Sequence, residues 1–177
     1  MMRRFARLAV VLAATLLGAC AGVDPAVYAD GKPALSLERY FNGTLDGYGM
    51  VQDRGGRVLR RFHVVVDARW EAGTATLDER FEWSDGERQR RVWTIRPAGP
   101  GRWTGSAPDV IGEARGTVSG NALNWKYVLA VPVDGSVWNL DFDDWMHLID
   151  DRVMLNRATM SKFGVRVGEV TLSFTRR

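Results

Sequence analysis

Residues 58–70 read VLRRFHVVVDARW, and the side chains alternate in character along this stretch. The even positions are mostly apolar: Val58, Phe62, Val64, Val66, Ala68 and Trp70. The odd positions hold polar side chains: Arg61, His63, Asp67 and Arg69. A period of two is typical of a β-strand that buries one face, so this stretch predicts a long strand.

The residues that follow repeat the pattern. Residues 75–83 alternate apolar and polar side chains, Ser84-Asp85-Gly86 supplies turn residues, and the alternation resumes over residues 88–95. Two alternating runs joined by a short glycine-containing turn predict a β-hairpin.

Six further strands are expected along the chain, over residues 101–107, 112–118, 123–131, 137–143, 153–161 and 169–175. Turns are expected at Ser119-Gly120-Asn121, at Asp134-Gly135 and at Gly47-Tyr48-Gly49. Only residues 35–41 and 144–148 are candidates for short helices. The count of roughly nine or ten short, regularly spaced strands is typical of all-β sandwiches and barrels.

The connections favour a barrel. Consecutive strands are joined by hairpin-like turns throughout, which suits an up-and-down meander, and a closed meander leaves no exposed strand edge. An immunoglobulin-like sandwich, which more often has longer crossover connections, is the alternative fold. We therefore expect a single antiparallel β-barrel of about nine or ten strands.

The first twenty residues predict an export signal. Arg3, Arg4 and Arg7 precede an apolar run over residues 8–17, which is shorter than the roughly 20 residues that a membrane-spanning helix needs. The run ends in Leu17-Gly18-Ala19-Cys20, which resembles the lipobox of bacterial lipoproteins. This resemblance implies cleavage before Cys20 and acylation of its sulfur. An ordinary signal peptide with an incidental cysteine is the alternative.

Cys20 is the only cysteine in the chain, so an intramolecular disulfide is excluded and lipidation is its obvious use. Ala21, in place of an aspartate, favours the outer membrane, with the protein facing the periplasm. We expect three parts: a signal peptide over residues 1–19, a lipidated and flexible tether over residues 20–34, and a barrel domain over residues 35–177.

Charge argues against nucleic acid as a partner. The chain carries 24 basic and 21 acidic residues, but three of the arginines lie in the signal. The rest of the chain is therefore close to neutral, without the basic excess that polyanion binding requires.

Several short motifs along the chain together resemble one family. They are Tyr40-Phe41-Asn42-Gly43, Leu77-Asp78-Glu79-Arg80-Phe81, Ser84-Asp85-Gly86-Glu87, Asp109-Val110-Ile111-Gly112, Asp143-Asp144-Trp145-Met146 and Asn156-Arg157-Ala158. This pattern resembles a family of bacterial lipoproteins catalogued as domain of unknown function 3833. The resemblance implies a lipoprotein and a lipocalin-like, or calycin-like, barrel, and it brings no catalytic residue with it.

Two charged residues are expected on the apolar side of the first hairpin. Glu79 shares its face with Trp83, and Arg91 shares the face of the next strand with Trp93. Such a pair inside a barrel is either a buried ion pair or a polar group that orients a mostly apolar ligand. The candidate ligand-binding residues are Glu79, Arg91, Trp83, Trp93, Trp125 and Tyr127.

A second candidate polar site consists of Asp143, Asp144, His147, Asn156 and Arg157. Two carboxyl groups and a histidine could act as acid and base, but adjacent strand residues point to opposite faces, so an acidic turn is the favoured interpretation. Arg157, with Asn156, Lys162 and Arg166, could form a cationic rim for lipid headgroups, or simply be solvated charge.

A metal site using His63 and His147 lacks the usual ligand spacing, and no metal or other cofactor is expected. The favoured function is an outer-membrane-anchored lipoprotein that binds or carries a small hydrophobic, lipid-like molecule in its barrel. The alternatives are a lipid-modifying enzyme that uses acidic residues and His147, and an envelope scaffold or assembly lipoprotein with a protein partner. Exposed tryptophans in one patch would favour the scaffold.

Overall fold

The computed structural model describes residues 22–133 and 135–177, so Cys20 and the predicted signal peptide lie outside the described residues. Ten strands make up the domain: β1 (Gly43–Asp53), β2 (Val58–Glu71), β3 (Thr74–Trp83), β4 (Arg88–Pro97), β5 (Arg102–Ser106), β6 (Val110–Ser119), β7 (Ala122–Val133), β8 (Ser136–Leu148), β9 (Val153–Lys162) and β10 (Val165–Arg176).

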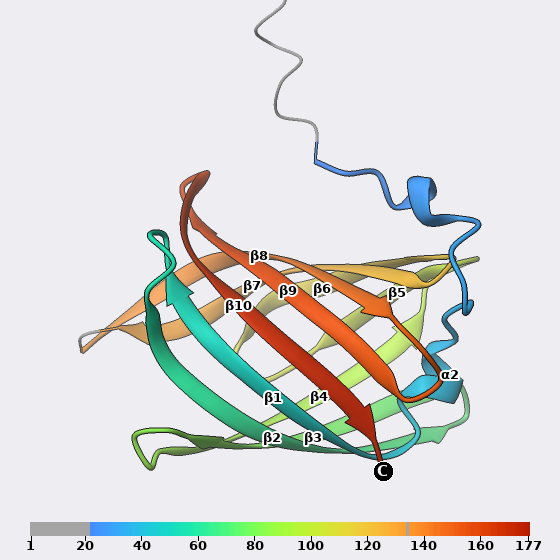
Figure 1. The fold of residues 1–177 in the computed structure, drawn as a ribbon, viewed down its shortest axis with the longest axis horizontal. Coiled ribbons are helices and arrows are strands. Elements are labelled where there is room, and N and C mark those ends of the chain that lie inside the picture. Colours follow the sequence, from blue (N-terminus) through green and yellow to red (C-terminus); the bar gives the residue numbers. More distant parts are fainter. Residues whose placement is uncertain (1–21, 134) are drawn as a thin grey trace, which may run out of the picture.

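The strands form a closed up-and-down barrel (Figure 1). Each strand pairs antiparallel with its neighbours in the sequence, and β1 pairs with β10 to close the wall, from Leu45 opposite Arg176 to Asp53 opposite Gly168. This arrangement confirms the predicted all-β, lipocalin-like barrel, and the alternative of a two-layer sandwich is wrong.

Two local predictions are wrong. Gly47-Tyr48-Gly49 is not a turn but the middle of β1, where Gly47 and Gly49 face inwards opposite Val64 and Phe62. A Cβ at Gly49 would overlap the Phe62 ring, so the glycine makes room for a large side chain of β2. Residues 144–148 are not helical but form the end of β8. This part of β8 pairs with β7 on one side and with β9 on the other.

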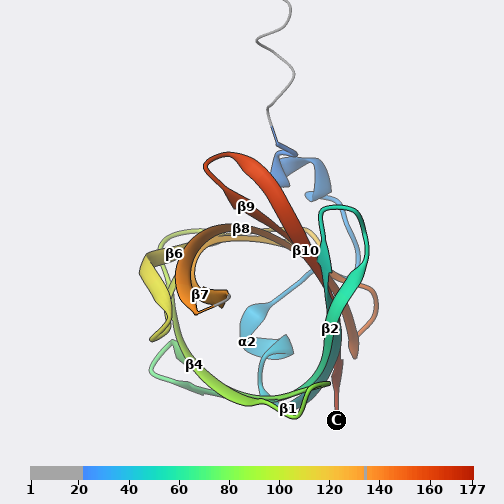
Figure 2. The same ribbon diagram turned by 90° about the vertical axis from the view of Figure 1, so that its left-hand side faces the viewer.

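One end of the barrel is covered by a short helix, α2 (Leu37–Tyr40), in the segment expected to be helical. Figure 2, a view along the barrel, shows α2 inside the ring of strands at the far end. The Tyr40 hydroxyl donates to the carbonyl oxygens of Arg152 and Phe174, and Trp70 Nε1 donates to the carbonyl oxygen of Phe41 at 2.7 Å. These bonds tie the helix to the strand ends, so this end of the barrel is closed.

The segment before the barrel is more ordered than expected. The 3-10 helix η2 (Pro25–Tyr28) is capped by Asp24, and the ring of Tyr28 packs edge-on against Trp145 and His147 on the outer wall. The prediction of little fixed structure is therefore wrong for this part of the tether.

The buried residues of the described chain all lie between Leu35 and Phe174, and the strands complete their own hydrogen bonding. Residues 22–177 thus contain one complete core and are expected to fold without the residues that precede them. Within the described ranges, no helix is both long and apolar enough to cross a membrane.

Candidate functional site

The interior of the barrel holds a cavity of about 580 Å³. Its floor is α2 with the side chains of Leu37 and Phe41, and its open end, called the mouth below, lies near Arg60, Glu87 and Pro132. The volume falls in the range of ligand pockets, and such pockets are mostly apolar with a few polar groups that fix orientation.

Most of the cavity wall is apolar. Its apolar and aromatic lining residues include Val51, Phe62, Phe81, Trp83, Trp93, Ile95, Leu123, Trp125, Tyr127, Leu129, Phe142, Met146, Met160, Val170 and Leu172. They come from inward positions on most of the strands, so the period of two in the sequence is what builds this wall.

A charged cluster lies on the side formed by β3 and β4. Glu79 and Arg91 are directly opposite each other in the ladder, as the sequence predicted for a hairpin, and both point inwards. Arg91 Nη2 lies 2.8 Å from Asp109 Oδ2, and Arg91 Nε donates to the same carboxylate. Arg91 Nη1 lies farther from Glu79 Oε2, at 3.7 Å.

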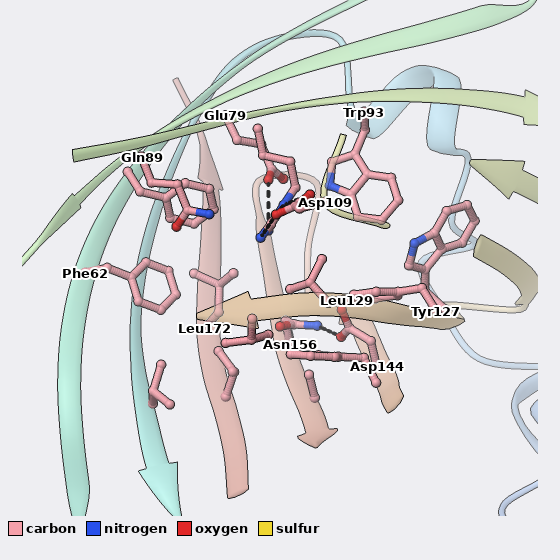
Figure 3. Close-up of a pocket in the computed structure, with 18 of the residues that line it drawn as sticks. Phe62, Glu79, Gln89, Trp93, Asp109, Tyr127, Leu129, Asp144, Asn156 and Leu172 are labelled. Carbon is pink, nitrogen blue, oxygen red and sulfur yellow. Dashed lines mark hydrogen bonds and ion pairs between the residues drawn. The ribbon is translucent and has the colours of Figure 1, made fainter. Parts of the chain in front are cut away.

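A second polar group approaches from β8 and β9. Figure 3 shows Asp144 and Asn156 on the opposite side of the cavity from Glu79 and Asp109. The Asn156 side-chain amide donates to Asp144 Oδ1, and both residues are buried. The two carboxyl groups, Glu79 and Asp144, therefore face one cavity from different elements.

Burial changes the protonation of both carboxyl groups. Loss of hydration raises the pKa of Glu79 to about 7, although the nearby Arg91 opposes the rise. Burial also raises the pKa of Asp144 to about 7, against the hydrogen bond from Asn156. Near neutral pH each group is poised between its neutral and charged forms.

The predicted aromatic residues Trp83, Trp93, Trp125 and Tyr127 all line the cavity. Trp93 packs edge-on against Trp125 and Tyr127, with ring centroids 5.9 Å and 5.4 Å away. Trp83 lies nearer the mouth, where the Arg60 guanidinium sits 4.1 Å from its ring centroid. The Trp83 Nε1 atom is buried and donates to no described residue.

The second predicted site is not one site, because its residues lie on both faces of the wall. Asp143 is on the outer face, where it accepts from Asn124 at 2.6 Å and lies 3.6 Å from Lys126 Nζ. His147 is also outside, stacked with Trp145, and partial burial lowers its pKa. The interpretation as an acidic turn is wrong, since these residues lie within β8, and only Asp144 reaches the cavity.

The grouping of Asn156 with Arg157 is wrong for the same reason. Asn156 points into the cavity, whereas Arg157 is two-thirds exposed outside and lies 2.7 Å from Glu169 Oε2. Arg166 pairs with the same carboxylate, and Lys162 lies over the Trp138 ring. Two of the three cations of the expected rim thus share one glutamate, which offsets one of their two charges.

The tryptophans do not gather in an exposed patch. Of the seven, all in the described part of the chain, Trp138 is the only one classed as exposed, at 37%. A shallow hollow does lie on the outer wall across β1, β10, β9 and β8, near Tyr48, Trp145 and Leu155.

Asp109 was missed as a site residue. It precedes β6 and reaches across to Arg91 on β4, so no local alternation marks it. The available signal was its position in the Asp109-Val110-Ile111-Gly112 motif. In the described residues, no three histidine, cysteine, aspartate or glutamate side chains are placed to hold a metal ion.

Comparisons with known proteins agree with the fold. The family model described as "Protein of unknown function (DUF3833)" matches residues 14–176. None of the curated proteins matches the chain.

Three solved structures are similar to this chain. An S-type phycobiliprotein lyase from Guillardia theta is similar, with 8% sequence identity, a TM-score of 0.60, and coverage of 81% of this chain and 93% of that chain. A de novo designed fluorescence-activating β-barrel has 13% identity, a TM-score of 0.43, and coverage of 81% and 99%. EF1p2_mFAP2b bound to DFHBI has 13% identity, a TM-score of 0.45, and coverage of 80% and 100%. At these identities the likeness concerns the fold alone.

Proposed function

We propose, for a chain that belongs to the DUF3833 family, that it is a binding protein which holds one small, mostly apolar molecule inside its barrel. The family description names no activity, so the proposal depends on the interior itself. The single observation that carries it is the cavity of about 580 Å³, which is walled by apolar side chains and contains a few polar groups.

The same proposal includes a cellular location. The lipobox-like Leu17-Gly18-Ala19-Cys20 supports a lipid-anchored protein of the cell envelope, on the periplasmic side of the outer membrane. There the guest would be a lipid or another hydrophobic compound of the envelope. Labelling of the full chain with a palmitate analogue, lost in Cys20→Ser, tests this anchor.

Binding can be tested with residues 22–177 and a neutral fluorescent probe, N-phenyl-1-naphthylamine, which brightens in apolar surroundings. We expect saturable binding of one probe per chain, and its displacement by an extract of envelope lipids. Native mass spectrometry of the same mixture would then give the mass of the retained lipid.

A variant at the mouth makes the test specific. Gln89 lines the cavity near the mouth, whereas Arg88, one residue earlier, is exposed on the outside. Gln89→Trp is expected to weaken probe binding at least tenfold by filling the entrance, and Arg88→Trp is the matched control. Equal binding by both variants, or no saturable binding by the unmodified chain, would contradict the proposal.

A lipid-modifying enzyme is the second candidate, because two carboxyl groups with pKa values near 7 share the cavity. Groups that titrate near the working pH are suited to general acid and base roles. This candidate expects the bound lipid to change mass during incubation, and Glu79→Gln to stop the change. A lipid that is recovered unaltered argues for binding alone.

A further inference from the structure

We propose that the cavity selects an organic cation, an apolar molecule that carries a protonated amine, and that it discriminates against free carboxylates. The inference rests on the proposed binding function and names the class of ligand. A fatty acid is apolar enough for such a cavity, but its carboxylate is not expected to bind beside these side chains.

The first argument is a charge count in the cavity. Arg91 is committed to Asp109, whose carboxylate it meets through both Nε and Nη2 at 2.8–3.0 Å. This pair is internally neutral. Glu79 has only the longer contact of 3.7 Å to the Arg91 cation, and its other side-chain partner, Trp93, is a neutral donor. Asp144 is also paired with neutral donors, the Asn156 amide and the Tyr127 hydroxyl. Two carboxyl groups therefore lack a close cation of their own.

Glu79 also has spare hydrogen-bonding capacity. Its Oε2 atom is buried and accepts no hydrogen bond from any described residue, and its side chain is only 12% exposed. A buried acceptor without a donor is unfavourable, so a guest that supplies a donor recovers this loss. An ammonium group has three N–H donors and a positive charge, so it supplies both the missing hydrogen bond and the missing cation.

The aromatic walls favour the same guest. The rings of Phe81, Trp93, Tyr127 and Phe142 line the same cavity as the two carboxyl groups, and Tyr127 stacks on Phe142 with centroids 4.9 Å apart. The faces of aromatic rings attract cations, and cages of such rings recognise organic ammonium groups. An anion gains nothing from these ring faces.

The two arginines that line the cavity are already paired with carboxylates of the protein. Arg91 already donates to Asp109, and Arg60 at the mouth pairs with Asp85 and Glu87 at 2.8 Å each. Among the described lining residues no other arginine or lysine occurs. A carboxylate would have to displace Asp109 from Arg91, or approach Glu79 and Asp144 against their charge.

Proton linkage provides an independent signature. Because burial holds the pKa of both Glu79 and Asp144 near 7, each carries a proton for much of the time at neutral pH. A bound cation favours the charged carboxylate, so binding of an ammonium guest must release protons. A neutral guest with the same chain would release few or none.

The experiment compares decylamine, decanol and decanoate, which share one chain and differ in the head group, below their micellar concentrations. Displacement of N-phenyl-1-naphthylamine from residues 22–177 at pH 7 is expected to show the amine binding at least tenfold more tightly than decanoate. Calorimetry in two buffers with different ionisation enthalpies is expected to show about one proton released per amine bound.

Two isosteric variants assign the effect to the carboxyl groups. Glu79→Gln and Asp144→Asn are each expected to reduce the preference for amine over alcohol at least fivefold. Asp141→Asn, at an exposed position of the same strand, is the matched control and is expected to keep the preference.

The outcomes separate this inference from the proposed function. Decanoate binding as tightly as decylamine, or amine binding without proton release, would overturn the inference and leave the proposed function standing. If the probe itself fails to bind saturably, both fall together. Should the variants not fold, the proton release of the unmodified protein still decides the matter.

Discussion

Asp144 is a carboxyl group that the fold keeps out of water, and this has a consequence for stability. Its pKa in the folded chain is raised by burial to about 7 from an ordinary value of 3.8. As the pH rises from about 4 to about 7, the unfolded chain loses the proton while the folded chain keeps it. Stability contributed by this group is therefore present at low pH, falls through that window, and stays low above it.

Asp144→Asn is expected to remove this loss. The amide is nearly the same shape, and its oxygen can still accept from Asn156. The variant should be more stable than the unmodified chain at pH 8, on the order of a few kcal/mol because one pKa unit corresponds to about 1.4 kcal/mol. The difference should shrink as the pH falls to 5.

Urea unfolding of residues 22–177 at pH 5 and pH 8 measures the effect. Asp141→Asn, at an exposed position of the same strand, serves as the control for a change of net charge. A stability difference for Asp144→Asn that is the same at both pH values would contradict the assignment of a raised pKa to this residue.

The strands β5, β6 and β7 pack closely around the indole ring of Trp125. Gly105 of β5 and Gly116 of β6 lie directly against the indole of Trp125 on β7, and a Cβ at Gly116 would overlap that ring. The close approach of backbone to indole is possible only because neither glycine has a side chain.

Gly116→Ala is expected to destabilise the protein by about 1–3 kcal/mol, because a well-packed core cannot admit an extra methyl group without shifting its neighbours. Thr117→Ala, the next residue of the same strand, has an exposed side chain and should change stability by about 0.5 kcal/mol or less. Thermal unfolding of the two variants measures the difference. Equal effects would mean that Trp125 can move aside.

The elements also show what sequence patterns can predict. The nine alternating stretches all became strands, since alternation over residues 58–70 or 123–131 directly reflects burial of one face of a wall. Strand β1 was missed because its inward positions hold Gly47 and Gly49, and two glycines around a tyrosine suggest a turn. In the structure the space beside these glycines is filled by Val64 and Phe62 of β2.

The candidate site, too, could be predicted from the sequence only in part. Glu79 and Arg91 could be paired in advance because a hairpin sets their register. Asp109 could not be joined to Arg91, since that contact depends on how β4, β5 and β6 curve around the barrel. Asp143 and Asp144 looked alike in the sequence, and only the place of β8 in the wall decides which one faces the cavity.

Closure of the barrel wall depends on its last strand, β10. β10 pairs with both β9 and β1, so removing it would expose two unpaired strand edges and open the interior. A chain that ends at residue 164 is expected to lose cooperative unfolding and to associate.

Circular dichroism during heating and light scattering measure this outcome. A chain that lacks only Arg177 is the control, because it loses one terminal backbone hydrogen bond to Thr44 and an exposed ion pair with Asp46 while the rest of β10 stays paired. A monomeric, cooperatively folded chain without residues 165–177 would show that the remaining nine strands close by themselves.

The position of α2 across one end of the barrel has a kinetic consequence. Because α2 blocks that end, the cavity opens at one end only, and a bound molecule must leave through the same opening by which it entered. An incoming molecule cannot push the occupant onward, so exchange has to wait for spontaneous departure. For the binding function proposed above, the closed end predicts that one bound molecule leaves before the next one enters.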